Sequence, residues 1–491
     1  MKKPAILAID EGTTNAKAVL IDQAGQIVAK ASRPLTITHP KAAWSEQDPL
    51  EVMQGVNESI AELLQSHSSY EVAGVAVSNQ RESVMFWHKE TGLPLTSLVT
   101  WQCRRSADFC AQLQQGELGH KVQVLSGLPI DPLFPAAKLK WLLENTPGLL
   151  SLAEEGVACA GTVDAWLVFN LTAKRSFVTD DSNASRTQLY SLGRAGWDPE
   201  LLEVFGIPKL CLPEIKPSSA YRGEVIGHAA IADGTPILSQ IGDSHAALYG
   251  QGGFMPGVIK ATYGTGSSLM TPLRSLIKSD DYRLARTVAW HDGQMTHAFE
   301  GNITHTGAGV SFMSRMLGIQ NIGQFADMAA ATTSNDGVYF VPALSGLGAP
   351  HWRSDVRGLI TGLTDNATPN VLARAAFEAI AYQVADVFYL TSALCGEPLE
   401  CLLADGGPTQ NHWLMQFQAD VLNRPVVRST NAEVSALGAG YLAGKALGWW
   451  CDRDDLALLD RGADIIEPSR DKSIAVAGYE GWKDAVARAL G

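Results

Sequence analysis

Two stretches of the chain share one pattern, in which a short apolar run leads into a turn of glycine and hydroxyl residues. Residues 5–9 are apolar and are followed by Asp10, Glu11 and the turn 12–15, after which residues 16–21 are again mostly apolar. Residues 257–263 lead in the same way into a turn of glycine, threonine and serine at 264–268. Strand-forming runs on both sides of a short glycine-containing turn are typical of hairpins, so each stretch is predicted to form a strand, a turn and a strand.

Such turns can bind phosphate. Their backbone N–H groups and hydroxyls can converge on an anion, and glycine permits a close approach. Either turn alone is explained more simply as an ordinary hairpin. The presence of one in each half of the chain, each near an aspartate, favours phosphate binding. The candidate phosphate ligands are Gly12, Thr13, Thr14, Thr265 and Gly266.

The rest of the chain shows strands interspersed with helices. Residues 72–78 form a buried apolar run, and residues 49–66 repeat apolar side chains at helical spacing after an Asp-Pro start. Further helices are predicted at about 370–393, 413–421 and 430–446. This pattern is typical of the α/β class.

Polar side chains follow two of the predicted strands. Arg81 and Glu82 come directly after the run 72–78, and Trp101 follows the extended residues 98–100. Open α/β sheets bind ligands at the carboxyl ends of their strands, and an aromatic face beside polar groups suits a sugar. Arg81 and Glu82 are equally compatible with a solvated surface pair, and a tryptophan is more often part of a core.

The second half of the chain offers two further candidate sites. Residues 402–411 predict a strand, an Asp-Gly-Gly turn and a helix start, which can seat a nucleotide or form a plain turn. Gly307 and Ser311 open a small-residue helix that leaves room for a flat ligand, although packing alone also explains such residues.

Composition narrows the function. A chain of 491 residues is expected to fold as two or three domains. Its net charge of −13 argues against nucleic-acid binding, which needs clustered Lys and Arg. The 7 cysteines show no C-x-x-C pair, which favours a cytoplasmic protein without a zinc site. The first apolar run stops at Asp10, so neither a signal peptide nor a membrane span is predicted.

Several motifs are missing, and their absence favours phosphoryl transfer. The chain lacks a P-loop, a complete G-x-G-x-x-G, H-E-x-x-H and G-x-S-x-G. Phosphoryl transfer needs a cradle for the donor phosphates, Mg²⁺ to neutralise charge and a carboxylate to take the acceptor's proton. The two turns, Asp10 and Asp243 can supply these parts.

In order along the chain, these motifs resemble those of the FGGY carbohydrate kinases, and among them most of all the glycerol kinases. The resemblance runs from Asp10-Glu-Gly-Thr-Thr through Asn79-Gln-Arg-Glu, Trp101-Gln-Cys-Arg-Arg and Gly242-Asp243 to Asp405-Gly-Gly. It implies two actin-like (ribonuclease H-like) domains with a cleft between them, here divided as residues 1–251, which bind the acceptor, and 252–491, which bind ATP. It also implies a homodimer that phosphorylates a small polyol or sugar.

The resemblance also implies a role for each matching position. Asp243 is the expected general base, and Asp10 and Asp243 are expected to hold Mg²⁺. Thr13, Thr14 and Thr265 are expected on the phosphates; the expected nucleotide-lining residues are Gly307, Ser311, Gly407 and Asn411. Arg81 and Glu82 are expected to bind acceptor hydroxyls, with Trp101 against the carbon chain.

Three positions depart from the glycerol-kinase pattern. Leu133, Ser244 and Ser268 stand where glycerol kinases have a tyrosine, a glutamine and an aromatic residue. Each change removes bulk from the acceptor side, and pockets discriminate by filled volume and paired polar groups. We therefore expect an acceptor larger than glycerol, a four- or five-carbon polyol or ketose. The alternatives are a glycerol kinase proper and, from another class, an actin-like ATPase without a small-molecule acceptor.

Overall fold

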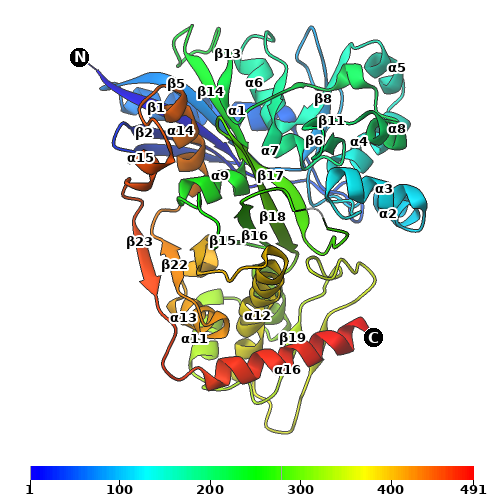
Figure 1. Cartoon of the computed structure of the whole chain (residues 1–491), viewed down its shortest axis with the longest axis vertical. Coiled ribbons are helices and arrows are strands. Elements are labelled where there is room, and N and C mark those ends of the chain that lie inside the picture. Colours follow the sequence, from blue (N-terminus) through cyan, green and yellow to red (C-terminus); the bar gives the residue numbers. More distant parts are fainter. Residues whose placement is uncertain (1, 278) are drawn as a thin grey trace. The chain divides into compact units, whose positions relative to one another are not determined.

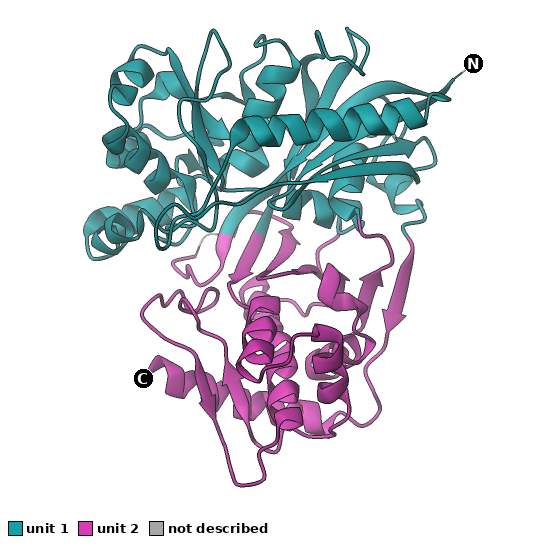
Figure 2. Cartoon of the chain, turned by 180° about the vertical axis from the view of Figure 1, so that it is seen from behind, with its two compact units in different colours: residues 1–254, 286–298, 433–461 teal, residues 255–285, 299–432, 462–491 magenta. Residues whose placement is uncertain are grey.

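The computed structural model describes residues 2–277 and 279–491 and consists of two compact units (Figure 2). Unit 1 comprises Met1–Phe254, Arg286–Ala298 and Glu433–Arg461, and unit 2 comprises Met255–Ala285, Phe299–Ala432 and Gly462–Gly491. The first change of unit comes after Phe254, close to the division after residue 251 that the sequence suggests. Two later segments return to unit 1, so a single cut does not describe the units.

Unit 1 contains a six-stranded sheet in the order β13-β14-β5-β1-β2-β3 (Figure 1). Its strands are β1 (Lys3–Glu11), β2 (Asn15–Asp22), β3 (Ile27–Pro34), β5 (Tyr70–Asn79), β13 (Ser219–Glu224) and β14 (Pro236–Gly242). β1 and β2 form the predicted antiparallel hairpin, and β1 and β14 both run parallel to β5. The carboxyl ends of three parallel strands therefore lie along one edge.

Helices pack on both faces of this sheet. Leu7 and Ile9 belong to the same core as Val52 and Val56 of helix α1 (Pro49–Ser66), which has the predicted bounds and whose start is capped by the Asp48 side chain. The other face is covered by α14 (Val434–Ala446). A Cβ at Gly440 would lie 2.3 Å from Ile21, so small residues in α14 permit its close approach to the sheet.

A second, four-stranded sheet in unit 1 has the order β4-β7-β6-β8. Its strands are β4 (Glu46–Gln47), β7 (Leu98–Val99), β6 (Val84–His88) and β8 (Ala158–Thr162). Around it lie helices α2 (Ala107–Gln114), α3 (Glu117–Ser126), α4 (Pro135–Asn145), α5 (Leu149–Glu154), α6 (Val163–Leu171) and α8 (Pro199–Phe205). This subregion carries the segment that contains Trp101.

Unit 2 is built on the strands β16 (Ser267–Leu273), β15 (Val258–Tyr263), β21 (Cys401–Asp405), β22 (Val426–Ser429) and β23 (Ala463–Ile466), in that order. β18 (Met295–Ile303) and β17 (Ala285–His291) follow β16 in the strand order, and residues 286–298 of these two strands are counted with unit 1. The main helices are α10 (Gly307–Met316), α11 (Ile322–Ala330), α12 (Pro369–Cys395), α13 (His412–Leu422) and α16 (Ser473–Leu490). The predicted helices at 370–393 and 413–421 are confirmed as α12 and α13.

The two sheets repeat one strand order. In unit 1, β1 pairs antiparallel with β2 and parallel with β5; in unit 2, β15 pairs antiparallel with β16 and parallel with β21. The next two strands also correspond. β14 pairs parallel with β5 as β22 does with β21, and β13 pairs antiparallel with β14 as β23 does with β22. The two glycine turns therefore occupy equivalent places, between the first two strands of each sheet.

A membrane-crossing helix would need a long apolar stretch, and none of the helices in the described residues has one.

Candidate active site

Several candidate residues of unit 1 lie at the carboxyl edge of its larger sheet, in or shortly after β1, β5 and β14. The strand register places Glu11 of β1 opposite Asn79 of β5, and Asn79 opposite Gly242 of β14. Asp10, Arg81 and Asp243 each lie within two residues of this row. The sequence placed them after strands, and the parallel pairing brings them together.

Asp243 is the first residue of helix α9 (Asp243–Gly250), and its side chain lies beside Arg81. The distance from Arg81 Nε to Asp243 Oδ1 is 3.1 Å, and 40% of the Asp243 side chain is exposed. Desolvation raises the pKa of the Asp243 carboxyl, while the Arg81 guanidinium opposes that rise. A Cβ at residue 242 would lie 2.5 Å from Arg81 Cγ, so glycine there leaves room for this pair.

Glu82 adopts a left-handed backbone conformation, with φ of 59°. Such a conformation is strained for a residue with a side chain and persists only where surrounding contacts hold it. The buried Lys138 amine donates to the Glu82 carbonyl at 2.7 Å and to the Leu133 carbonyl at 2.6 Å. Arg186 Nε donates to the Glu82 carboxylate at 2.6 Å. Lys138 therefore links Glu82 to Leu133, the position expected to govern acceptor size.

The first glycine turn is tied to the loop that carries Trp101. The indole N–H of Trp101 donates to the Thr13 hydroxyl at 3.0 Å, and both side chains are partly buried. Gly12 N–H donates to the Asn15 carbonyl at 3.0 Å and closes the turn, while Thr14 is exposed. Thr13 is expected to bind phosphate and Trp101 is expected to contact the acceptor. These two residues are thus in direct contact within one unit.

Lys17 is a member of this site that sequence reasoning missed. Its amine lies 3.7 Å from Asp10 Oδ2 and 2.8 Å from Glu433 Oε2. Lys17 stands opposite Asp10 in the β1–β2 register, so counting across the predicted hairpin could have found it. Burial raises the pKa of Asp10, and the charge of Lys17 opposes this rise.

The carboxylates fit a metal that arrives with a nucleotide. In the part of the chain that the structure describes, no group of three or more His, Cys, Asp or Glu side chains could hold a metal ion. Mg²⁺ typically uses one or two carboxylates, substrate phosphates and water rather than a cage built only from protein. Asp10 also raises the pKa of Asp243 by charge repulsion, which a cation near both would relieve.

In unit 2, the second glycine turn supports the start of helix α10. The N–H of Gly307 donates to the Gly264 carbonyl at 3.0 Å, and the N–H of Thr306 donates to the Thr265 carbonyl at 3.0 Å. A Cβ at Gly266 would lie 2.5 Å from the Ile303 carbonyl oxygen, and one at Gly307 would lie 2.6 Å from that of Gly264. Glycine is needed at both positions because backbones meet there, and Thr265 remains exposed.

The remaining nucleotide candidates lie around this turn. Ser311 is one helical turn after Gly307, and both are partly exposed. Gly407 is exposed with open space at its Cβ position, directly after Gly406, which packs against the Tyr263 backbone. Asn411 caps helix α13, since its side-chain oxygen accepts from Leu414 N–H at 3.1 Å. The structure thus brings the four nucleotide candidates near one turn. The side-chain oxygen of Asn411 is already engaged as the helix cap.

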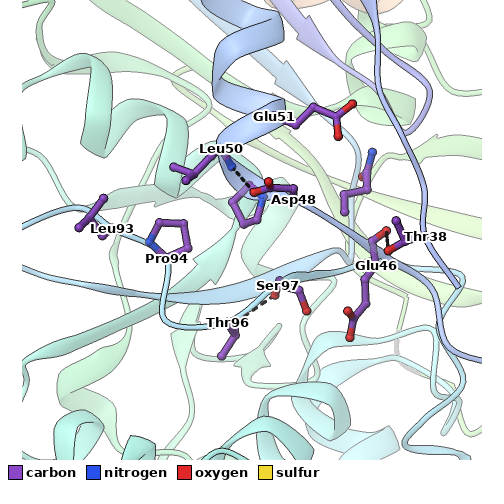
Figure 3. Close-up of a pocket in the computed structure, with 11 residues that line it drawn as sticks. Thr38, Glu46, Asp48, Leu50, Glu51, Leu93, Pro94, Thr96 and Ser97 are labelled. Carbon is purple, nitrogen blue, oxygen red and sulfur yellow. Dashed lines mark hydrogen bonds between the residues drawn. The ribbon is translucent and has the colours of Figure 1, made fainter. Parts of the chain in front are cut away.

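Unit 1 also holds a cavity of about 520 Å³, shown in Figure 3. It lies between β4, the start of α1 and the segment 93–97, and its wall carries the carboxylates of Glu46, Asp48 and Glu51. None of the candidate site residues lines it. Gln47 does line it, and the Gln47 side chain donates to the Thr13 carbonyl.

Comparison with known proteins identifies the family. Residues 5–250 match the model of the N-terminal domain of the FGGY family of carbohydrate kinases, and residues 259–447 match the C-terminal domain. The chain is 51% identical over 491 residues to an apulose kinase of Pectobacterium atrosepticum, covering 100% of this chain and 99% of that one. It is 41% identical over 495 residues to a glycerol kinase of Carboxydothermus hydrogenoformans, with 100% and 99% coverage.

Solved structures agree with this assignment. Plasmodium falciparum glycerol kinase with ADP matches with a TM-score of 0.92 and 32% identity, over 100% of this chain and 99% of that one. A xylulose kinase from Lactobacillus acidophilus has the same fold, with a TM-score of 0.90 at 23% identity. The expected actin-like α/β fold, the use of ATP with Mg²⁺ and the kinase activity are confirmed. The chain belongs to the FGGY family of carbohydrate kinases, phosphotransferases that use ATP to phosphorylate a hydroxyl of a small polyol or sugar.

Proposed function

We propose that the acceptor is larger than glycerol, a four- or five-carbon polyol or ketose, and that apulose is the first compound to test. The observation that carries this proposal is the identity of 51% with an apulose kinase along the whole chain, against 41% with a glycerol kinase of similar coverage. Glycerol remains the second candidate, because several relatives are named glycerol kinases.

The local structure supports a roomier acceptor site. Leu133 and Ser244 are small or apolar where a glycerol kinase is expected to have tyrosine and glutamine, and each neighbours a proposed acceptor residue. Leu133 is linked through Lys138 to Glu82, and Ser244 follows Asp243 in α9. In unit 2, the Ser268 hydroxyl donates to Glu300 at 2.7 Å, so this short side chain is turned toward its own sheet. Less bulk at these positions favours a longer carbon chain.

We assign the chemical step to Asp243. Its carboxylate is proposed to accept the proton of the acceptor hydroxyl as that oxygen attacks phosphorus. Arg81 holds the carboxylate by an ion pair, which favours the ionised form that a base needs. Arg81 and Glu82 are proposed to bind acceptor hydroxyls, with the Trp101 ring against the carbon chain.

Phosphate and nucleotide contacts are divided between the units in this proposal. Gly12, Thr13 and Thr14 in unit 1, and Thr265 and Gly266 in unit 2, are proposed to bind phosphate oxygens through N–H and hydroxyl groups. The rest of the nucleotide is proposed to contact Gly307, Ser311, Gly407 and Asn411. Asp10 and Asp243 are proposed to hold Mg²⁺, which supplies positive charge to the phosphate oxygens.

A panel of acceptors tests the proposal. ADP release is measured with glycerol, a four-carbon polyol, five-carbon ketoses and apulose, and kcat/KM is compared. A ketose or longer polyol is expected to exceed glycerol. A tenfold preference for glycerol contradicts the size argument, and turnover that no acceptor stimulates favours an ATPase without a small-molecule substrate.

We also propose a homodimer that works in the cytoplasm. The dimer follows from the family resemblance, and light scattering coupled to gel filtration measures it. The compartment is supported by the 7 cysteines, all of which carry free thiols in the structure. Reduced thiols are typical of the cytoplasm.

A further inference from the structure

A closed ring of hydrogen bonds joins the Trp101 loop to the first glycine turn. One link is the Trp101 indole to the Thr13 hydroxyl at 3.0 Å. The other side of the ring starts at the Trp101 backbone N–H, which donates to Ser83 Oγ at 3.0 Å; Ser83 Oγ in turn donates to Gln80 Oε1 at 2.8 Å. Gln80 Nε2 donates to Gln47 Oε1 at 2.7 Å, and Gln47 Nε2 donates to the Thr13 carbonyl at 2.9 Å.

The three side chains that connect Trp101 to Thr13 on the longer side of the ring are shielded from solvent. Gln47, Gln80 and Ser83 are at most 2% exposed. Gln80 Nε2 also donates to the buried Glu11 carboxyl at 2.8 Å, directly after Asp10. In a low-dielectric interior a fully satisfied network is rigid, whereas a network that lacks one member leaves buried groups unpaired. A shift of Thr13 or Trp101 is therefore opposed by the whole ring.

We propose that Gln47 is a positioning residue that couples the acceptor loop to the phosphate turn. Gln47 comes from the two-residue strand β4, far in sequence from the other members, and it is the member that holds the backbone of Thr13. An acceptor that fixes Trp101 fixes Thr13 through the ring, so the phosphate turn binds nucleotide with less loss of freedom. This inference rests on the proposed roles of Thr13 and Trp101.

The test measures the coupling itself. The Kd of the preferred acceptor is determined by calorimetry without nucleotide and with saturating ADP, and the ratio of the two values is the coupling factor. Wild type is expected to bind acceptor at least about fivefold tighter with ADP, the lower end of typical coupling. In Gln47→Met, which keeps the length, removes both hydrogen bonds of Gln47 and leaves the direct bond from Trp101 to Thr13, the coupling factor is expected to fall at least about twofold.

Three further variants keep the test independent of folding. Gln240→Met removes a fully buried glutamine of β14, in the larger sheet of unit 1, whose amide donates to Asp164 and Val178 outside the ring, so its coupling factor is expected to stay as in wild type. Ser83→Ala opens the ring at another position and is expected to lower the coupling factor as Gln47→Met does. Combined with Gln47→Met it should add little, since an open ring cannot be opened again.

The inference is overturned by a wild-type factor of one, by unchanged coupling in Gln47→Met or Ser83→Ala, or by equal loss in Gln240→Met. If Gln47→Met does not fold, Ser83→Ala alone decides. Because the assay uses whichever acceptor the enzyme prefers, a wrong acceptor assignment leaves this test intact.

Discussion

Replacing Asp243 by asparagine tests the assignment of the chemical step. The amide has the shape of the carboxylate but cannot take the proton of the acceptor hydroxyl. General-base catalysis typically contributes about 10²–10⁴ in rate, which corresponds to about 2.7–5.5 kcal/mol of barrier. We therefore expect kcat to fall by about that factor, with more lost if the same side chain also holds Mg²⁺.

The effect of this variant on stability is expected to be much smaller. Asp243→Asn leaves Arg81 beside a neutral amide at a distance that is 3.1 Å in the wild type. Loss of a fully buried ion-pair partner costs about 3–5 kcal/mol, but the Asp243 side chain is 40% exposed, so we expect about 1–2 kcal/mol after solvent screening. A large loss of rate with a small loss of stability therefore distinguishes catalysis from folding.

A coupled assay of ADP release gives kcat, calorimetry gives the Kd of ADP, and thermal unfolding gives Tm. The Kd of ADP is expected to stay within about threefold of the wild-type value, because the contacts to adenine and ribose are proposed to lie in unit 2. The control is Asp233→Asn, at an exposed aspartate of a surface loop in the same unit, and it should behave as wild type. Turnover of Asp243→Asn close to wild type, or a rate loss that a matching loss of folded protein explains, would refute the assignment.

Three other variants test the acceptor specificity, the joining of two segments of unit 1, and the pH dependence of stability. Leu133→Tyr restores the bulk expected in glycerol kinases and should shift the kcat/KM ratio toward glycerol by about 10–200-fold, and an unchanged ratio in the acceptor panel contradicts the size argument. Asp292→Asn should lower the free energy of unfolding in urea by about 3–5 kcal/mol, because its side chain, 1% exposed, pairs with Arg453 at 2.7 Å and joins two segments of unit 1; a loss below about 1 kcal/mol argues against this role. Burial raises the pKa of Asp386 from 3.8 to about 6, so the folded state holds a proton that the unfolded chain has released, and its contribution to stability is lost as pH rises through 6. Relative to Asp386→Asn, wild type should therefore lose about 1 kcal/mol between pH 5 and pH 7, and parallel stability curves would contradict the shift.

Local pattern was sufficient to predict the elements that carry the site. The helix over residues 49–66 combines helical spacing with an Asp-Pro start, and the Asp48 side chain indeed caps it. The strand that ends at Asn79 and the hairpin around residues 12–15 are likewise predicted by continuous apolar runs and turn chemistry. Since ligands of α/β sheets bind at strand ends, these elements sufficed to nominate Asp10, Arg81 and Asp243.

The contacts between distant segments could not be predicted in this way. Gln47 lies in a two-residue strand between two acidic residues, and nothing in its neighbourhood indicates that its side chain holds Thr13. The return of residues 433–461 to unit 1 depends on contacts such as Lys17 with Glu433, which join positions more than 400 apart. Trp101 was nominated for its apolar face, whereas the structure also shows its N–H bound to Thr13.

The two glycine turns occupy equivalent places in the repeated strand order, but different residue types surround them. In unit 1 the equivalent strand ends carry Asp10 and Asp243, with amide side chains between them. In unit 2, β15 matches β1 and leads into Gly264, and β21 matches β5 and leads into Gly406, where a Cβ would lie 2.0 Å from the Tyr263 carbonyl oxygen. Carboxylates suit proton transfer and metal binding, whereas glycine turns, whose backbone a phosphate can approach closely, suit an anionic ligand. The shared fold therefore provides two equivalent edges, and the residue types at each edge divide the proposed acceptor and nucleotide chemistry between the units.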